Sequence, residues 1–445
     1  MRYFFVGIGG VSMSALAKLL FKEGKQVAGS DAVASANTQE LATLGIPIYI
    51  GHTAANLQHE SVQYLVINGA IADDNPEWLF AQQNGIKIIY RETLLAQIAR
   101  RYQNVVAIAG CHGKSTTTAM IGSVFKCAGQ QPTVHNGAQN NLQIGGKQWF
   151  ITEACEFRKS FLKLKPRIAV ITNVDEDHLD CYKDLNEIKK CFERFASQSD
   201  IVIKNADDVN SSSLRGRQRT VTFGIKCGDV HANNIYQLPG GGYRFEIVIN
   251  PKIFGTIYQL PVFNVRVPGV HNVSNALATI TCALVCQIGL ASTNQALSTY
   301  SGIARRFQHF AQIGNTPIIL DYAHHPREIS ATIQTARNLY NKYLLVFQPH
   351  TYTRTVALWD DFVRVLSLVP NLVMYKTFAA RGKMIVGGRA LDLSRQLKVK
   401  YLATPTVLIA YLKQHAHEYD AIILCGAGDV VSGEFLRQCS FVTFD

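Results

Sequence analysis

A phosphate-binding turn is predicted between residues 104 and 118, where an apolar run leads through glycines into an amphipathic pattern. Val105 to Ala109 has the continuous hydrophobicity of a buried parallel strand. The turn Gly110-x-x-Gly113-Lys114-Ser115 follows, and apolar residues at helical spacing come after it. Glycines let backbone N–H groups approach an anion, and a helix start adds partial positive charge. Lys114 can therefore reach the outer phosphates of a nucleotide, and the Ser115 hydroxyl can ligate magnesium.

The glycine spacing of this turn leaves a second interpretation open. The strict P-loop pattern has a glycine five residues before Gly113, where this chain has Ile108. The shorter pattern also occurs in ordinary strand-to-helix turns. The strand before it and the helix after it favour the phosphate cradle.

Composition predicts a soluble globular chain of several domains. The 445 residues exceed one ordinary core, and 47% hydrophobic with 17% charged residues is typical of folded proteins. No window has the apolar length of a membrane span. Glycines interrupt the apolar N-terminus, which is unlike a signal peptide. We expect a cytoplasmic protein.

The net charge of +12 permits anionic partners without specifying them. Lysine and arginine are spread along the chain, so a generally basic surface explains the charge at least as well as small anionic substrates do. We expect small-molecule substrates and no nucleic acid. The ten cysteines include no Cys-x-x-Cys pair, which favours reduced thiols over metal or disulfide roles.

The N-terminal residues predict a Rossmann-like β-α-β start. A short strand, Tyr3 to Val6, leads into Gly7-Ile-Gly9-Gly10-Val-Ser12 and then a helix. Asp31 lies 21 residues after Gly10 in the chain, where such folds place an acid near a ribose. Ser12 replaces the third glycine of the dinucleotide pattern. A nicotinamide dinucleotide and another diphosphate nucleotide therefore both remain possible ligands.

Polar side chains follow several later strands. Glu153 and His178 come just after predicted strands downstream of the cradle, which suits a magnesium–nucleotide site. His324, His350 and Arg354 follow strands of a third unit. Because ligands bind beyond the carboxyl ends of strands in open α/β sheets, these residues are candidates for a substrate site.

Motifs along nearly the whole chain resemble those of the Mur ligase family of peptidoglycan synthesis. They include Glu153-Ala-Cys-Glu156, Thr172-Asn-x-x-x-Asp-His178 and His271-Asn-x-x-Asn-Ala276, after the two glycine motifs above. Four further motifs, three of them in the third domain, narrow the resemblance to the branch that uses L-alanine. These motifs are Arg305-Arg306-Phe307, Asp321-Tyr-Ala-His-His-Pro326, Phe347-Gln-Pro-His-Thr-Tyr-Thr-Arg-Thr355 and Gly426-Ala-Gly-Asp429.

The resemblance implies an α/β protein of three domains. Residues 1–99 would form a Rossmann-like UDP-sugar-binding domain, residues 100–312 a central P-loop-type ATP-binding domain, and residues 313–445 a Rossmann-like domain on the amino-acid side. The implied reaction is ATP-dependent and joins L-alanine to the lactyl carboxylate of UDP-N-acetylmuramate through an acyl phosphate. ATP and Mg²⁺ are the implied cofactors, and the chain would be a monomer or homodimer.

The resemblance also implies residue roles. Lys114, Glu153, His178, His324 and Arg354 would be catalytic, and Ser115, Glu153 and His178 would hold magnesium. Tyr322, His324, His350 and Arg354 would lie on the amino-acid and muramate side. The UDP-sugar would contact Gly7, Gly9, Gly10, Ser12, Ser30 and Asp31. ATP would contact Gly110, Cys111, His112, Gly113, Lys114, Ser115, Thr116, Asn272, Asn275, Arg306 and Asp321.

Three alternatives remain at this point. The first is a related ligase that adds another amino acid or a peptide. The second is a nicotinamide-dependent oxidoreductase, which would leave the Lys114 cradle unexplained. The third is a catalytically silent relative that only binds a UDP-sugar, against which the retention of Lys114, Glu153 and His178 argues.

Overall fold

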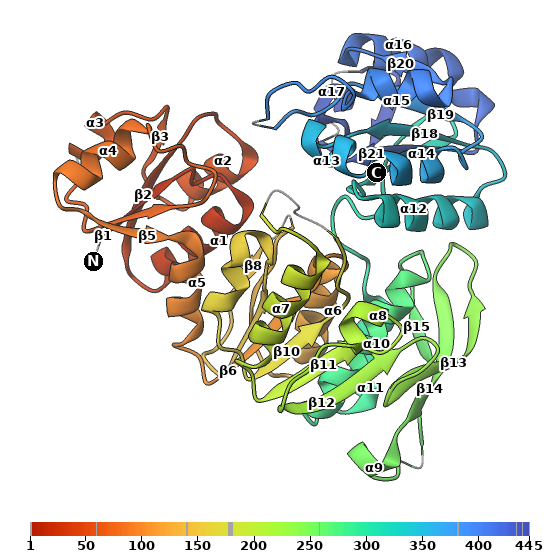
Figure 1. Cartoon of the computed structure of the whole chain (residues 1–445), viewed down its shortest axis with the longest axis horizontal. Helices are drawn as coiled ribbons and strands as arrows, with labels where there is room; N and C mark the ends of the chain where they lie inside the picture. Colours follow the sequence, from red (N-terminus) through yellow and green to blue (C-terminus); the bar gives the residue numbers. More distant parts are fainter. Residues whose placement is uncertain are drawn as a thin grey trace. The chain divides into compact units, whose positions relative to one another are not determined.

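The computed structural model describes residues 2–58, 60–138, 141–176, 181–257, 259–380, 382–432, 434–437 and 439–444. The chain divides into two compact units. Unit 1 contains residues 1–233, 247–261 and 275–297, and unit 2 contains residues 234–246, 262–274 and 298–445. Helices and strands alternate through most of the chain (Figure 1). The predicted α/β class is confirmed.

Unit 1 begins with a five-stranded parallel sheet in the order β3-β2-β1-β4-β5. The first-strand prediction, Tyr3 to Val6, matches β1, and helix α1 follows the glycine turn as predicted. The strands are β1 (Arg2–Val6), β2 (Gln26–Asp31), β3 (Ile48–Ile50), β4 (Tyr64–Ile67) and β5 (Lys87–Tyr90). The helices are α1 (Val11–Lys22), α2 (Ala36–Thr43), α3 (Ala55–Gln58), α4 (Pro76–Gln83) and α5 (Arg91–Ala99).

The central sheet carries the predicted phosphate-binding turn. Eight of its strands lie side by side in the order β13-β12-β11-β10-β6-β9-β7-β8. They are β6 (Asn104–Ala109), β7 (Thr133–His135), β8 (Leu142–Gln143), β9 (Trp149–Glu153), β10 (Ile168–Ile171), β11 (Ile201–Asn205), β12 (Arg219–Gly224) and β13 (Val230–Gln237). Strand β6 lies between β10 and β9, and its residues 105–109 are buried, which explains their uninterrupted hydrophobicity.

Helices connect and follow these strands. They are α6 (Lys114–Cys127), the 3₁₀ segment η1 (Phe157–Lys163), α7 (Leu185–Ala196), α8 (Val209–Ser212), α9 (Pro251–Phe254), α10 (His271–Val285) and α11 (Leu290–Thr299). Strand β14 (Tyr243–Ile249) pairs antiparallel with β15 (Phe263–Val265).

One hydrophobic cluster joins the first sheet of unit 1 to the central sheet. It contains Leu95 of α5, Tyr102, Phe150 of β9 and Phe161 of η1. The rings of Tyr102 and Phe150 have centroids 4.8 Å apart. Because this core is continuous, the glycine turn after β1 and the cradle after β6 belong to one packed body.

The third sheet, in unit 2, is seven-stranded in the order β20-β19-β18-β21-β17-β16-β22. Strand β16 (Gln308–Ile313) pairs antiparallel with β17 (Thr316–Asp321), so this sheet begins before residue 313, where the sequence places the domain boundary. The other strands are β18 (Tyr343–Gln348), β19 (Leu372–Tyr375), β20 (Lys400–Leu402), β21 (Ala421–Gly426) and β22 (Val442–Phe444). The helical segments are α12 (Pro326–Leu339), α13 (Tyr352–Ala357), α14 (Trp359–Leu366), α15 (Ala390–Leu397), α16 (Pro405–His415), η2 (Ala416–Glu418), η3 (Asp429–Val431) and α17 (Glu434–Arg437).

None of the helices in the described part of the chain has the length and hydrophobicity that a membrane span requires.

Candidate functional site

The cradle between β6 and α6 depends on two glycines with positive φ. Gly110 has φ +141°, and a Cβ there would overlap Thr172 Oγ1. Gly113 is the N-cap of α6 with φ +80° and ψ −4°, a left-handed conformation that glycine adopts without strain. No side chain in the described part of the chain caps α6. Its first N–H groups, which include those of Ser115 and Thr116, are therefore available to an anion.

Lys114 is held at the centre of the cradle by Glu156. Both carboxylate oxygens of Glu156 lie 3.0 Å from Lys114 Nζ, which also donates to the carbonyl oxygens of Gly110 and Cys111. Burial alone would lower the pKa of Lys114, but the negative charge of Glu156 raises it above its ordinary value. The lysine is therefore a fixed cation.

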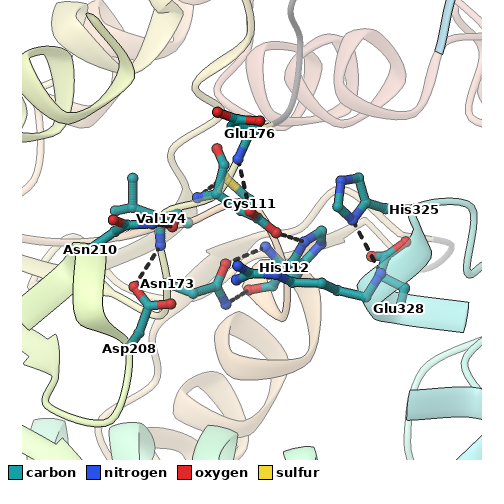
Figure 2. A network of polar contacts seen from close by, with 12 residues as sticks. Cys111, His112, Asn173, Val174, Glu176, Asp208, Asn210, His325 and Glu328 are labelled. Carbon is teal, nitrogen blue, oxygen red and sulfur yellow. Dashed lines mark hydrogen bonds and ion pairs between the residues drawn. The ribbon is translucent and has the colours of Figure 1, made fainter. Parts of the chain in front are cut away.

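The loop after β10 holds the cradle in place through hydrogen bonds. Asn173 accepts a hydrogen bond from His112 N at 2.9 Å and donates one to His112 O at 2.9 Å (Figure 2). The Cys111 thiol donates to Asp175 O at 3.3 Å and accepts from Asp175 N at 3.1 Å. His112 Nε2 lies 3.4 Å from Asp175 Oδ2. These contacts fix the backbone of residues 111 and 112.

Two of the three predicted magnesium ligands come close to one loop. Gly137 N donates to Glu153 Oε1 at 2.6 Å, and the neighbouring Asn136 donates to Ser115 O at 3.0 Å. Neither the Ser115 hydroxyl nor Glu153 Oε2 hydrogen bonds to a described residue. A hydroxyl and a carboxylate oxygen are ligands that Mg²⁺ prefers, so these residues fit the ion. His178, the third, lies outside the described residues.

Asn275 borders the start of α6. Its Oδ1 accepts from Thr117 Oγ1 at 3.2 Å, and a Cβ at Gly113 would lie 2.6 Å from the same oxygen. The side chain of Asn272 instead donates to Pro268 O at 2.7 Å, as a helix-start contact.

The glycine turn after β1 is stabilised by Asp31. The Gly9 N–H donates to Asp31 Oδ2 at 2.8 Å, so one oxygen of the acid expected near a ribose is engaged within the turn. Gly7 has φ +75°, and Gly10 is the N-cap of α1 without a side-chain cap. The turn therefore presents helix N–H groups at the carboxyl edge of the sheet.

Ser30 lies inside a buried polar network rather than at the surface. Its hydroxyl donates to Glu77 Oε2 at 2.7 Å and lies 3.0 Å from His52 Nδ1. Glu77 is fully buried and also accepts from Asn56 at 2.7 Å. Ser30 O accepts from Gly7 N and Ile8 N, so this residue supports the turn through its backbone.

Ser12 connects the glycine turn to the central sheet through residues that sequence reasoning missed. Its hydroxyl lies 3.0 Å from His135 Nε2 and 3.4 Å from Arg91 Nη1. The other ring nitrogen of His135 lies 2.9 Å from Thr152 Oγ1. Burial and the charge of Arg91 lower the pKa of His135 to about 3, so the ring is neutral.

In unit 2, Arg306 and Asp321 occupy a charged cluster near Tyr322. Arg306 Nη1 lies 3.4 Å from Glu328 Oε1, and its guanidinium lies 5.6 Å from the Tyr322 ring centroid. Burial alone would lower the pKa of Arg306, but Glu328 and Asp321 raise it. Burial raises the pKa of Asp321 to about 6, against the opposing charge of Arg306.

The structure also brings together His324, His350 and Arg354. The two imidazole centroids are 5.8 Å apart, and Arg354 Nη1 donates to His350 O at 3.0 Å. Burial and the Arg354 charge lower the pKa of His350 to about 4. His324 Nδ1 lies 2.8 Å from Tyr322 O. This is a compact polar cluster at the carboxyl ends of β17 and β18, as the strand-end argument predicts.

Three family models match the chain in succession. Residues 2–103 match the Mur ligase family catalytic domain, residues 108–283 the Mur ligase middle domain, and residues 305–428 the Mur ligase glutamate ligase domain. The chain belongs to the Mur ligase family. The resemblance stated from motifs alone is confirmed, and so is the three-domain fold.

Individual Mur ligases are similar to this chain over nearly all its length. The UDP-N-acetylmuramate–L-alanine ligases of Clostridium perfringens and Clostridium novyi are 37% and 38% identical, over 96% of this chain and 95% and 94% of their own. The crystal structure of the UDP-N-acetylmuramate–alanine ligase MurC of Thermotoga maritima has a TM-score of 0.81 at 29% identity, covering 98% of this chain and 99% of that one. A murein peptide ligase of Psychrobacter arcticus has a TM-score of 0.72 at 22% identity, covering 99% and 98%.

Proposed function

We propose that this chain is an ATP-dependent ligase that joins L-alanine to the lactyl carboxylate of UDP-N-acetylmuramate. The supporting observation is its 36–38% identity, over 96% of its length, to several Mur ligases named for that reaction. The products would be ADP, phosphate and UDP-N-acetylmuramoyl-L-alanine. The Lys114 cradle supports a phosphoryl-transfer step in particular.

The proposed chemistry has two steps. The lactyl carboxylate attacks the γ-phosphorus of ATP, the bond to the β-phosphate oxygen breaks, and ADP leaves. The amine of L-alanine then attacks the resulting acyl phosphate, loses a proton, and expels inorganic phosphate. A carboxylate is a poor electrophile, so phosphorylation supplies the leaving group, and fixed cations stabilise the charge that moves.

Lys114 and the open N–H groups of α6 would bind the β- and γ-phosphates. Magnesium, when bound, would neutralise phosphate charge, and Ser115, Glu153 and His178 would hold it. Asn272, Asn275, Arg306 and Asp321 would contact the nucleotide. Their assignments rest on family resemblance, together with the polar surroundings described above.

The glycine turn of Gly7, Gly9 and Gly10, with Ser12, Ser30 and Asp31, would hold the UDP part. Gly9 and Asp31 support one another, and Ser30 acts through its backbone. The cluster of Tyr322, His324, His350 and Arg354 would bind the amino acid, whose carboxylate suits the Arg354 guanidinium.

The test is phosphate release from ATP with magnesium and UDP-N-acetylmuramate, with each amino acid and then a short peptide added in turn. We expect release that depends on L-alanine, and a product mass of UDP-N-acetylmuramoyl-L-alanine. Release that requires a peptide in place of L-alanine would instead support the peptide-ligase alternative. Binding of UDP-N-acetylmuramate without phosphate release would support the silent relative.

A further inference from the structure

The 3₁₀ segment after the Lys114–Glu156 pair is interrupted by two strained residues. Arg158 has φ +50° and ψ +29°, and Lys159 has φ +57° and ψ +23°. Consecutive left-handed residues other than glycine are unfavourable because the side chain crowds the backbone. Such conformations persist where the surrounding structure enforces them, and they concentrate at functional sites.

The two basic side chains of this turn have different surroundings. Lys159 Nζ lies 2.6 Å from Glu187 Oε1, so its charge is paired. The Arg158 side chain is exposed, and it hydrogen bonds or ion pairs with none of the described residues. Its guanidinium lies 5.6 Å from the Phe157 ring centroid. The turn therefore displays a cation that no described carboxylate neutralises.

This cation lies beside Gly69, in the loop that follows β4. A Cβ built on Gly69 would lie 2.6 Å from Arg158 Nη1 and 3.3 Å from its Cζ. Strand β4 pairs in parallel with β1, so residues 68–69 leave the sheet beside the Gly7 turn. A Cβ on Gly7 would lie 3.4 Å from Ile71 Cδ1. Arg158 thus reaches from the central sheet to the carboxyl edge of the first sheet.

We propose that Arg158 is a substrate-binding residue whose guanidinium contacts an anionic group of the sugar nucleotide, either its pyrophosphate or its lactyl carboxylate. Guanidinium pairs with both groups through parallel N–H···O bonds. The inference rests on the proposed function, which supplies the sugar nucleotide. It adds a cation from the segment that also carries Glu156, so one segment would contact both the ATP cradle and the second substrate.

Calorimetric titration of the full chain without ATP tests this proposal. We compare UDP-N-acetylglucosamine, which has only the pyrophosphate, with UDP-N-acetylmuramate, which has both anions. In Arg158→Gly we expect Kd to rise on the order of tenfold or more. If the variant loses affinity for both ligands, Arg158 contacts the pyrophosphate. If it loses affinity for UDP-N-acetylmuramate alone, Arg158 contacts the lactyl carboxylate.

Two further measurements separate binding from folding. Because glycine accepts the left-handed conformation, Arg158→Gly should keep or raise the melting temperature while it weakens binding. Lys159→Ala removes a cation from the same turn that Glu187 already neutralises, so its Kd should stay within about twofold of wild type. Wild-type affinity of Arg158→Gly for both ligands would overturn the role of Arg158 alone. Failure of the wild-type chain to bind either ligand would overturn the proposed function as well.

Discussion

Lys114 Nζ lies 3.0 Å from each carboxylate oxygen of Glu156, and the Glu156 side chain is only 2% exposed. Each of these two buried charges is therefore neutralised mainly by the other. Removing one partner of a buried pair leaves an isolated charge in a poorly solvated site. We therefore expect the lysine of the cradle to contribute to folding stability as well as to the proposed chemistry.

Lys114→Ala should abolish ATP-dependent phosphate release and lower the free energy of unfolding by about 3 kcal/mol, because Glu156 loses its partner. The double variant Lys114→Met with Glu156→Gln should recover most of that stability and none of the activity. Urea unfolding and phosphate release measure the two effects separately. A double variant as unstable as the single one would mean that the pair is not what stabilises the site.

Gly113→Ala should weaken ATP binding beyond the effect of backbone strain. Its Cβ would meet Asn275 Oδ1 at 2.6 Å, whereas Gly129, after the other end of α6, has φ +75° and nothing within 4 Å of its Cβ. Both substitutions force alanine into a left-handed conformation, at a cost of roughly 1 kcal/mol. We expect an increase of about tenfold or more in KM for ATP in Gly113→Ala, and little change in Gly129→Ala. Equal KM values would rule out the Asn275 contact as the cause.

Glu153→Gln should raise the magnesium concentration needed for half-maximal activity about tenfold or more, because a neutral amide is a weaker ligand than a carboxylate. The amide oxygen of the substituted side chain can still accept from Gly137 N, so the loop should remain in place. At saturating magnesium, KM for ATP should approach that of the wild type. The check is a magnesium titration of the phosphate-release rate, and an unchanged titration would remove Glu153 from the metal site.

The buried neutral ring of His135 should make stability depend on pH. The unfolded chain takes up a proton near pH 6.5, whereas the folded ring has its pKa lowered to about 3. Its contribution is complete above pH 6.5, and it decreases by up to about 1.4 kcal/mol per pH unit as the pH falls towards 3. His135→Gln removes the one proton that the unfolded chain takes up at this position, so it should reduce the slope of stability against pH by up to about 1.4 kcal/mol per pH unit. Urea unfolding between pH 4.5 and 7.5 is the measurement, and parallel curves for the two proteins would contradict it.

Local pattern was sufficient to predict strand β6 and the helix that follows its glycine turn. The apolar run of Val105 to Ala109 lies in β6, and the helix expected after the glycine turn is α6, which begins at Lys114, within that turn. These features depend on residues that are close together in the chain. Burial of a strand selects apolar residues, and a left-handed turn selects glycine, so residue types indicate both. Strand β16 was not anticipated, because its half-buried residues lack a clear apolar run.

The sequence could not predict contacts between residues that lie far apart in the chain. Ser12 and His135 are 123 positions apart, and neither residue type indicates the other. The motif containing Glu153 and Glu156 suggested two acids, but only the fold shows that Glu156 faces Lys114 while Glu153 faces the loop at Gly137. Asp31 was expected near a ribose. Its hydrogen bond from Gly9 N depends on the path of the glycine turn relative to the end of β2, which residue types do not indicate.

The reduced thiols of this chain make selective labelling practicable. All ten cysteines lie within the described ranges and are free, and of these only Cys127 and Cys227 are exposed. The cradle thiol of Cys111 is buried against Asp175. Partial burial and a hydrogen bond to Asp207 raise the pKa of Cys227, which slows its reaction with maleimides near neutral pH. A brief treatment should therefore place a dye first on Cys127, at the opposite end of α6 from Lys114. A fluorescent reporter could follow nucleotide binding there without any engineered residue.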